Sequence, residues 1–239
     1  AELPWKYVVW TTSCLALLGG ALIGFTVPDG PYRKKGQQLE WHAFTKGFKN
    51  RHFRAAAFGY FGHMWELYAF WAFVPLMLSY YNQQYGNINV PLYAFAIIAS
   101  GSVACVVNGL LSQKVAPKKL AAASLFLSCL CCLASPLFLK GAAPLLLLLF
   151  LLFWGWVVVA DSPMFSTLVA QHAPPEVRGT ALTIVNCMGF AITIISIQLV
   201  SFLLTPNNTA YLFAVLAVGP VLGLWALMKK APGYYLQHN

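Results

Sequence analysis

The sequence predicts an all-α integral membrane protein with seven transmembrane helices. Of its 239 residues, 59% are hydrophobic and only 9% are charged, whereas soluble domains are about 45–50% apolar and about 25% charged. Apolar segments of roughly 20 residues recur along the chain, and a helix of that length crosses a hydrocarbon core about 30 Å thick. A soluble fold of this size could not bury so much apolar surface, so we expect lipid to surround part of the protein.

Turn signals rich in Gly, Pro and Asn separate the seven apolar segments. The segments cover residues 5–27, 53–80, 91–113, 120–139, 144–171, 178–204 and 210–228. The longest polar stretch separates the first segment from a block of six. We therefore predict four parts: a transmembrane helix at 1–27, a basic cytoplasmic linker at 28–52, a six-helix domain at 53–230 and a cytoplasmic tail at 231–239.

Lys and Arg are concentrated in every second loop of this arrangement. The stretch 28–52 and the loop 114–119 are basic, whereas the loops 81–90 and 205–209 contain neither Lys nor Arg. Basic loops stay in the cytoplasm, so the pattern predicts an outside N-terminus and a cytoplasmic C-terminus. Topology and lipid headgroups then explain the formal net charge of +9, and we expect no nucleic acid partner.

The six cysteines lie inside apolar segments and form no metal-binding pattern. Those at positions 129, 131 and 132 lack the spacing of a zinc site, and no His or acid is near them in sequence. We interpret them as small apolar helix residues. The sequence also contains no phosphate-binding loop and no hydrolase or metalloprotease motif. It therefore predicts no metal, no cofactor, no enzyme activity and no direct use of ATP.

The loop between the third and fourth segments carries a pattern at residues 109–119. It resembles, in degenerate form, the G-x-x-x-D-R-x-G-R-R loop of the major facilitator superfamily. Gly109 matches the first glycine, Gln113 replaces the acid and Lys114 keeps the positive charge. Lys118 and Lys119 keep the basic character of the last two positions. Degenerate copies of this loop are expected in the second half of such transporters.

The resemblance extends over the whole chain. Residues 59–71 resemble the seventh helix of bacterial members, and residues 160–166 and 175–182 resemble the tenth helix and the start of the eleventh. Two groups of three helices in opposite orientation form the repeat within each half of these transporters. The resemblance implies helices six to twelve of a twelve-helix transporter of the cell inner membrane. The partners it implies are the lipid bilayer and either a missing N-terminal half or a second membrane chain.

Two acids, Glu66 and Asp161, lie within apolar segments. A charge at the bilayer centre costs at least about 2.5–3.5 kcal/mol, so such residues are candidates for function. His63 precedes Glu66 by three residues and shares its helical face. One hypothesis is that this pair couples proton movement to substrate movement, and the other is that it anchors two helices by a hydrogen bond. Trp65 and other nearby aromatic residues could line a substrate cavity.

Asp161 is followed by Ser162 and Pro163 in the middle of the fifth segment. Pro163 has no N–H and clashes with the preceding turn, which predicts a kink beside a carboxyl group. Freed carbonyl groups and Asp161 could line a cavity, because irregular backbone at membrane depth is tolerated only inside protein or beside water. Alternatively, Asp161 caps the lower half-helix. We favour a structural or gating role for this site over direct contact with substrate.

These features together predict secondary active transport of a small solute by alternating access, coupled to protons. The substrate is a small molecule whose class the sequence does not specify. Two alternatives stay open at this point. One is a transporter-like scaffold subunit of a larger membrane complex, and the other is a half-transporter that forms homodimers.

Overall fold

The computed structural model describes residues 4–28, 47–86 and 88–229. The chain divides into two compact units, Ala1–Gln38 and Leu39–Asn239, which are described separately. No strand is present in the described residues. Most of the predicted linker at 28–52 and the whole of the predicted tail at 231–239 lie outside the described residues.

The first unit contains one helix, α1 (Trp5–Thr26). Its 22 residues correspond to about 33 Å at 1.5 Å per residue, enough to cross a bilayer core.

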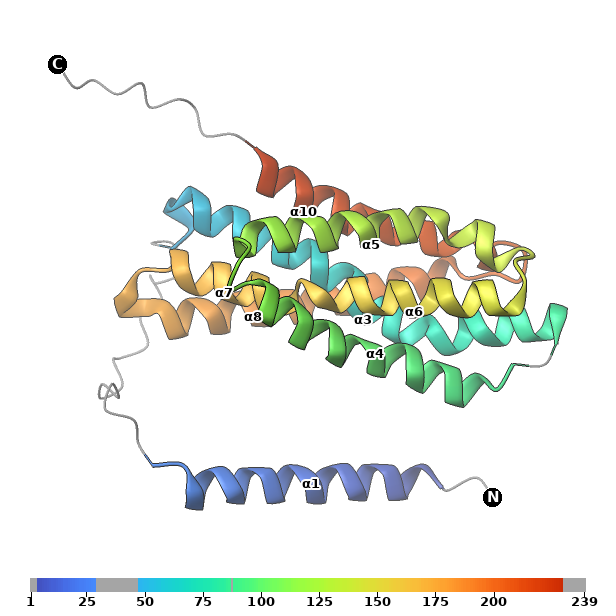
Figure 1. The fold of residues 1–239 in the computed structure, drawn as a ribbon, viewed down its shortest axis with the longest axis horizontal. Helices are drawn as coiled ribbons and strands as arrows, with labels where there is room; N and C mark the ends of the chain where they lie inside the picture. The colour runs from blue at the N-terminus through green and yellow to red at the C-terminus, as the bar shows by residue number, and fades with distance from the viewer. Residues whose placement is uncertain (1–3, 29–46, 87, 230–239) are drawn as a thin grey trace. The chain divides into compact units, whose positions relative to one another are not determined.

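The second unit is a bundle whose long helices run along a common direction (Figure 1). Its helices are α3 (Arg51–Tyr85), α4 (Val90–Leu111), α5 (Pro117–Leu139), α6 (Pro144–Ala160), α7 (Ser162–His172), α8 (Arg178–Leu203), α9 (Thr209–Leu212) and α10 (Val218–Met228), with short 3-10 turns at Pro175–Val177 and Phe213–Ala217. Start signals in the sequence explain several of these boundaries. The side chains of Asn50 and Asn89 cap α3 and α4, and α4, α5 and α6 each have proline in the first turn.

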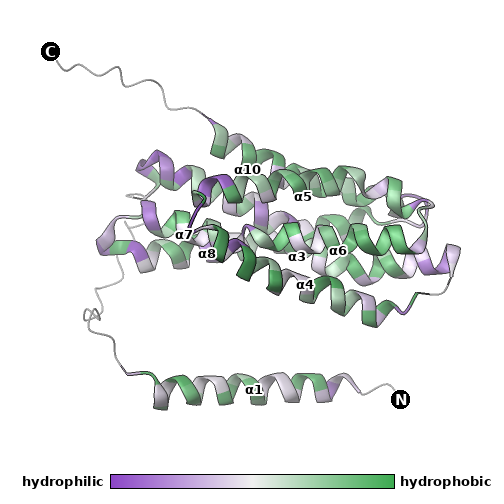
Figure 2. Cartoon of the chain, in the orientation of Figure 1, coloured by the Kyte–Doolittle hydropathy of each residue, from purple (hydrophilic) through white to green (hydrophobic). Residues whose placement is uncertain are grey.

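Six stretches of the described chain are long and apolar enough to cross a membrane, and α6 with α7 counts as one of them. The predicted second span, α3, is not among the six, although its 35 residues make it long enough. It is less apolar because it carries His63 and Glu66 toward the interior of the bundle, where other helices cover them. Figure 2 shows that hydrophilic residues otherwise gather at the ends of the helices.

The same packing arrangement occurs twice in the bundle. The first group of spans is α3, α4 and α5, and the second group is α6 with α7, α8 and α10. The first span of the first group, α3, packs against α8 and α10 of the second group. The first span of the second group, α6 with α7, packs against α4 and α5 of the first group. Each leading span therefore contacts the second and third spans of the other group, as expected for a three-plus-three inverted repeat.

Glycines bring the backbones of neighbouring spans together in the bundle. A Cβ on Gly62 of α3 would lie 2.3 Å from the carbonyl oxygen of Gly219 in α10, and a Cβ on Gly219 would lie 2.5 Å from the carbonyl oxygen of Gly62. Gly101 and Gly189 similarly leave room for side chains of α6 and α3. Gly101, Gly189, Gly219 and Gly223 thus permit close packing of the spans, because small residues let membrane helices approach one another.

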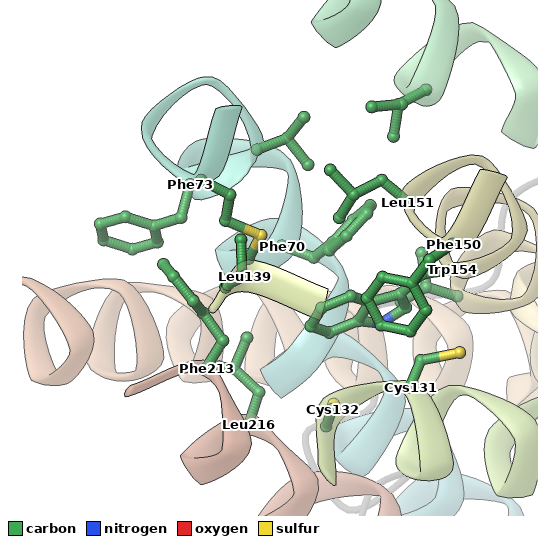
Figure 3. Close-up of a cluster of buried hydrophobic side chains, with 14 of the residues drawn as sticks. Phe70, Phe73, Cys131, Cys132, Leu139, Phe150, Leu151, Trp154, Phe213 and Leu216 are labelled. Carbon is green, nitrogen blue, oxygen red and sulfur yellow. The ribbon is translucent and has the colours of Figure 1, made fainter. Parts of the chain in front are cut away.

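Trp154 of α6 is fully buried near the centre of the apolar core (Figure 3). Its ring centroid lies 4.7 Å from that of Phe70 in α3 and 5.7 Å from that of Phe150. Residues from α5 and from the Phe213–Ala217 turn complete this cluster. The indole is thus buried at the contact between α3, α5 and α6.

Candidate functional site

His63 and Glu66 lie one turn apart near the middle of α3, and both side chains are almost wholly buried. Their relative exposures are 1% and 0%. Charged side chains are rarely buried to this degree unless they have partners. The contacts of each residue therefore indicate its role.

Three donors surround the carboxyl group of Glu66. The indole Nε1 of Trp154 donates to Oε1 at 2.8 Å, and the thiol of Cys132 donates to the same oxygen at 3.2 Å. The hydroxyl of Ser128 donates to Oε2 at 2.9 Å. The Ser128 oxygen also lies 3.1 Å from the carbonyl oxygen of Leu125, so its single proton can serve either acceptor. Glu66 thus joins α3 to α5 and α6.

His63 faces a different neighbour. Its Nδ1 lies 2.9 Å from Oδ1 of Asp161, and both side chains are 1% exposed. Its Nε2 lies 2.7 Å from the hydroxyl oxygen of Ser162. Asp161 Oδ1 is buried and has no hydrogen-bond partner in the described part of the chain, so we describe this contact as an ion pair that forms when the imidazole is protonated. His63 thus joins α3 to the junction of α6 and α7.

His63 and Glu66 share a helical face as predicted, but the structure shows no direct contact between them. Residues three apart on a helix point about 60° from each other. That difference is enough for His63 to reach the α6–α7 junction while Glu66 reaches α5 and Trp154. The predicted pair is therefore two adjacent polar sites, and Asp161 belongs to one of them.

The fifth predicted segment is interrupted at Asp161, where α6 ends and α7 begins. Pro163 cannot donate the hydrogen bond that the carbonyl of Val159 would receive in a continuous helix. Side chains of α4 contact the carbonyls at this junction. The side-chain amide of Asn108 donates to the carbonyl oxygen of Ala160 at 2.6 Å. The Sγ of Cys105 lies 3.9 Å from the carbonyl oxygen of Val159.

Asp161 does not cap α7 with its side chain, which contradicts the alternative that we considered from the sequence. Its carboxyl group faces His63 instead. The interruption therefore places a carboxyl group and the hydroxyl of Ser162 against α3 at membrane depth. An uncharged polar residue such as Asn108 in an apolar helix commonly holds two helices together. Here its side-chain amide joins α4 to the end of α6 by donating to the carbonyl oxygen of Ala160.

Trp65 does not join either polar site. It lies beside α8 and α10, where its side chain lines an apolar groove with Gly62 and Gly219. Its indole Nε1 is buried and has no hydrogen-bond partner in the described part of the chain, and the same holds for Trp71. Trp71 is packed edge-on against Tyr68, with ring centroids 5.3 Å apart.

The predicted loop motif lies at the end of the bundle that contains the start of α5. Gly109 is in the last turn of α4, and Gln113 and Lys114 occupy the exposed turn that follows. Lys118 and Lys119 are exposed in the first turn of α5. The motif therefore forms a basic surface turn, and its first residue, Gly109, directly follows Asn108, which contacts the break between α6 and α7.

The chain matches the family model described as Major Facilitator Superfamily over residues 1–197 and again over residues 56–234. The chain belongs to the major facilitator superfamily. No curated protein and no solved structure matches it. The two family matches overlap, so one stretch of this chain aligns with the family pattern in two ways, as expected for a family built from repeats.

As a member of this superfamily, the chain is a multi-pass membrane protein of the major facilitator transporter type. The all-α, major-facilitator-type fold class predicted from the sequence is confirmed by the family match and the helical bundle, and six of the seven predicted spans are long and apolar enough to cross a membrane. The family is one of transporters, which accords with the absence of catalytic motifs from the sequence.

Sequence reasoning missed all three partners of Glu66 in this major facilitator chain, Ser128, Cys132 and Trp154. We had interpreted Cys132 only as a small apolar residue. A signal was nevertheless present, because Ser124, Ser128 and Cys132 follow one another at intervals of four on one face of α5. Such a stripe of small polar residues in an apolar helix is a reason to look for a buried polar partner.

Proposed function

We propose that this chain contributes to proton-coupled secondary active transport of a small solute across the cell inner membrane. It would act with a second helical half, on the same polypeptide or on another chain, because alternating access requires two bodies that move around a site near the membrane midplane. The solute class is left open.

The observation that carries the proposal is the placement of two buried carboxyl groups on the two spans that lead the inverted repeats. Glu66 lies on α3, and Asp161 lies between α6 and α7. Transporters of this kind place their substrate and ion sites at the interface between repeats, near the midplane and beside interrupted helices. Ionisable groups at that depth are costly and serve function by default.

The surroundings of Glu66 suit both of its protonation states. When the carboxyl group is ionised, Trp154, Cys132 and Ser128 all donate to it. When Oε2 carries a proton, the Ser128 hydroxyl can turn to donate to the carbonyl of Leu125, 3.1 Å away, and accept the new proton. No polar group is left without a partner in either state. A site of this kind can load and release a proton without disrupting the core.

His63 and Asp161 would respond to the same cycle at the α6–α7 junction. Loss of charge from either partner weakens the 2.9 Å contact that joins α3 to this junction. The interruption at Asp161 then allows α7 to change direction relative to α6, because the backbone is not held there by a continuous helical ladder. We propose a gating role for this pair and a proton-carrying role for Glu66.

The test uses proteoliposomes that contain the complete transporter and a trapped pH-sensitive dye. Sugars, amino acids, carboxylic acids and cationic drugs are added in turn, and the dye reports whether each solute drives proton movement. We expect at least one solute to do so with the wild type and to lose this effect with Glu66→Gln. Solute entry with an unchanged proton signal in Glu66→Gln would contradict the proposal.

A further inference from the structure

An apolar groove runs along α3 between α8 and α10. Phe58, Gly62 and Trp65 of α3 line it, and it has a volume of about 450 Å³. Its other lining residues include Ile192, Ile195 and Leu222. From Phe58 to Trp65 the groove follows α3 for about two helical turns, or roughly 10 Å.

The groove continues into a basic pocket of about 340 Å³ at the start of α3. Arg51, Arg54 and Lys229 line this pocket. The two spaces share Phe58, Trp225 and Ala226 as lining residues, so they form one continuous depression. Among the described residues that line it, none is acidic.

The cations at this end are held in place by contacts with the protein. The Nη2 of Arg51 donates to the carbonyl oxygen of Lys229 at the end of α10. The Nη1 of Arg54 donates to the carbonyl oxygen of Phe48 at 2.9 Å. The ammonium group of Lys229 lies 4.7 Å from the centre of the Trp225 ring. Positive charge is therefore concentrated where the apolar groove reaches the end of the helices.

We propose that this depression binds one anionic phospholipid. An acyl chain occupies the apolar groove, and the headgroup phosphate is held by Arg54 and Lys229, with Arg51 beside them. The shape and charge match such a lipid: an apolar channel along a membrane helix leads directly to three cations at its end. Basic pockets between transmembrane helices bind anionic headgroups in this manner. Neither His63 nor Glu66 lines this depression.

The test measures how strongly spin-labelled phosphatidylglycerol and phosphatidylcholine are immobilised by the complete transporter in bilayers. We expect the wild type to prefer phosphatidylglycerol and the double variant Arg54→Ala/Lys229→Ala to lose about tenfold or more of that preference. The matched control, Lys114→Ala/Lys119→Ala, removes the same charge at the exposed loop motif and should keep the preference. Equal loss in both double variants would overturn the proposal, as would equal binding of the two lipids by the wild type.

The apolar part of the site is tested by two neighbouring residues of α8. Ile195 lines the groove and Ile194 does not, although both are about equally exposed, at 60% and 63%. Ile195→Trp should fill the groove and reduce the number of immobilised lipids by one per transporter, whereas Ile194→Trp should not. If the second half of the transporter covers the groove, neither variant will alter lipid binding, and that result would also overturn the proposal.

Discussion

The indole N–H of Trp154 lies 2.8 Å from Oε1 of Glu66, and both side chains are fully buried. The bond joins the leading spans of the two inverted repeats, α3 and α6. The same glutamate reaches α5 through Ser128 and Cys132. A carboxyl group that connects three spans is well placed to sense, and to alter, how the repeats pack.

The first prediction concerns the strength of this bond. Trp154→Phe removes the donor and leaves a small gap, so we expect a loss of about 1–3 kcal/mol in the free energy of unfolding. A double-mutant cycle with Glu66→Gln should give a coupling of about 1 kcal/mol, because the two residues are in direct contact. Trp225→Phe, at an exposed indole, should change stability by less than about 0.5 kcal/mol. Reversible unfolding in mixed detergents measures all three, and zero coupling would contradict the assigned contact.

The second prediction concerns the protonation of Glu66. Infrared difference spectra recorded on acidification should contain a carboxylic acid C=O band that is absent from Glu66→Gln. Ser128→Ala removes the hydroxyl that changes partners between the two states, so it should shift that band to higher frequency by removing a hydrogen bond. Ser102→Ala, at an exposed hydroxyl of α4, serves as the control and should leave the band in place. An identical band in wild type and Glu66→Gln would show that another group titrates.

The third prediction concerns the contact between α3 and α10. Gly62→Ala would place a Cβ 2.3 Å from the backbone oxygen of Gly219, and a backbone atom cannot move aside as a flexible side chain can. We expect a loss of about 1–3 kcal/mol from overpacking. Gly109→Ala, whose Cβ meets nothing within 4 Å, should be neutral or slightly stabilising, since alanine favours helix. Equal stability of the two variants in thermal unfolding would contradict the close approach.

The fourth prediction concerns the pair of His63 and Asp161. His63→Leu leaves a buried carboxyl group without its counter-ion, and we expect it to cost about 3–5 kcal/mol. Asp161→Leu removes the other member of the pair and should also destabilise the protein. The double variant His63→Leu/Asp161→Leu should be more stable than His63→Leu alone. Additive losses, measured by the same unfolding assay, would indicate that the two residues do not act as a pair.

Much of the fold follows from the sequence because the bilayer imposes simple constraints. Apolar length and the alternation of basic loops predict the helical segments, and the helix boundaries at Leu139 and Pro144 match the predicted ones. The C-terminal end of α3 was harder to predict from the sequence, because α3 continues to Tyr85. Tyr85 donates a hydrogen bond to the carbonyl of Lys140 at 2.8 Å, a tertiary contact that accompanies the extension of this helix beyond the predicted residue 80.

The candidate site was only partly predictable for a related reason. Glu66 and Asp161 stand out because acids are rare in apolar segments. Their partners do not stand out, since Ser128, Cys132 and Trp154 are ordinary residues of membrane helices. Which partner each acid meets depends on the rotation and crossing of α3, α5 and α6, and these are decided by packing rather than by local pattern. For this reason the sequence suggested a link between His63 and Glu66 that the structure replaces with two separate sites.

The most direct test of proton coupling at Glu66 compares two modes of transport in the same proteoliposomes. Exchange of labelled for unlabelled solute across the membrane requires only movement of the loaded transporter, whereas net uptake driven by a pH gradient also requires release of the proton. We predict that Glu66→Gln retains exchange and loses gradient-driven uptake. Gradient-driven uptake by Glu66→Gln at the wild-type rate would contradict the account.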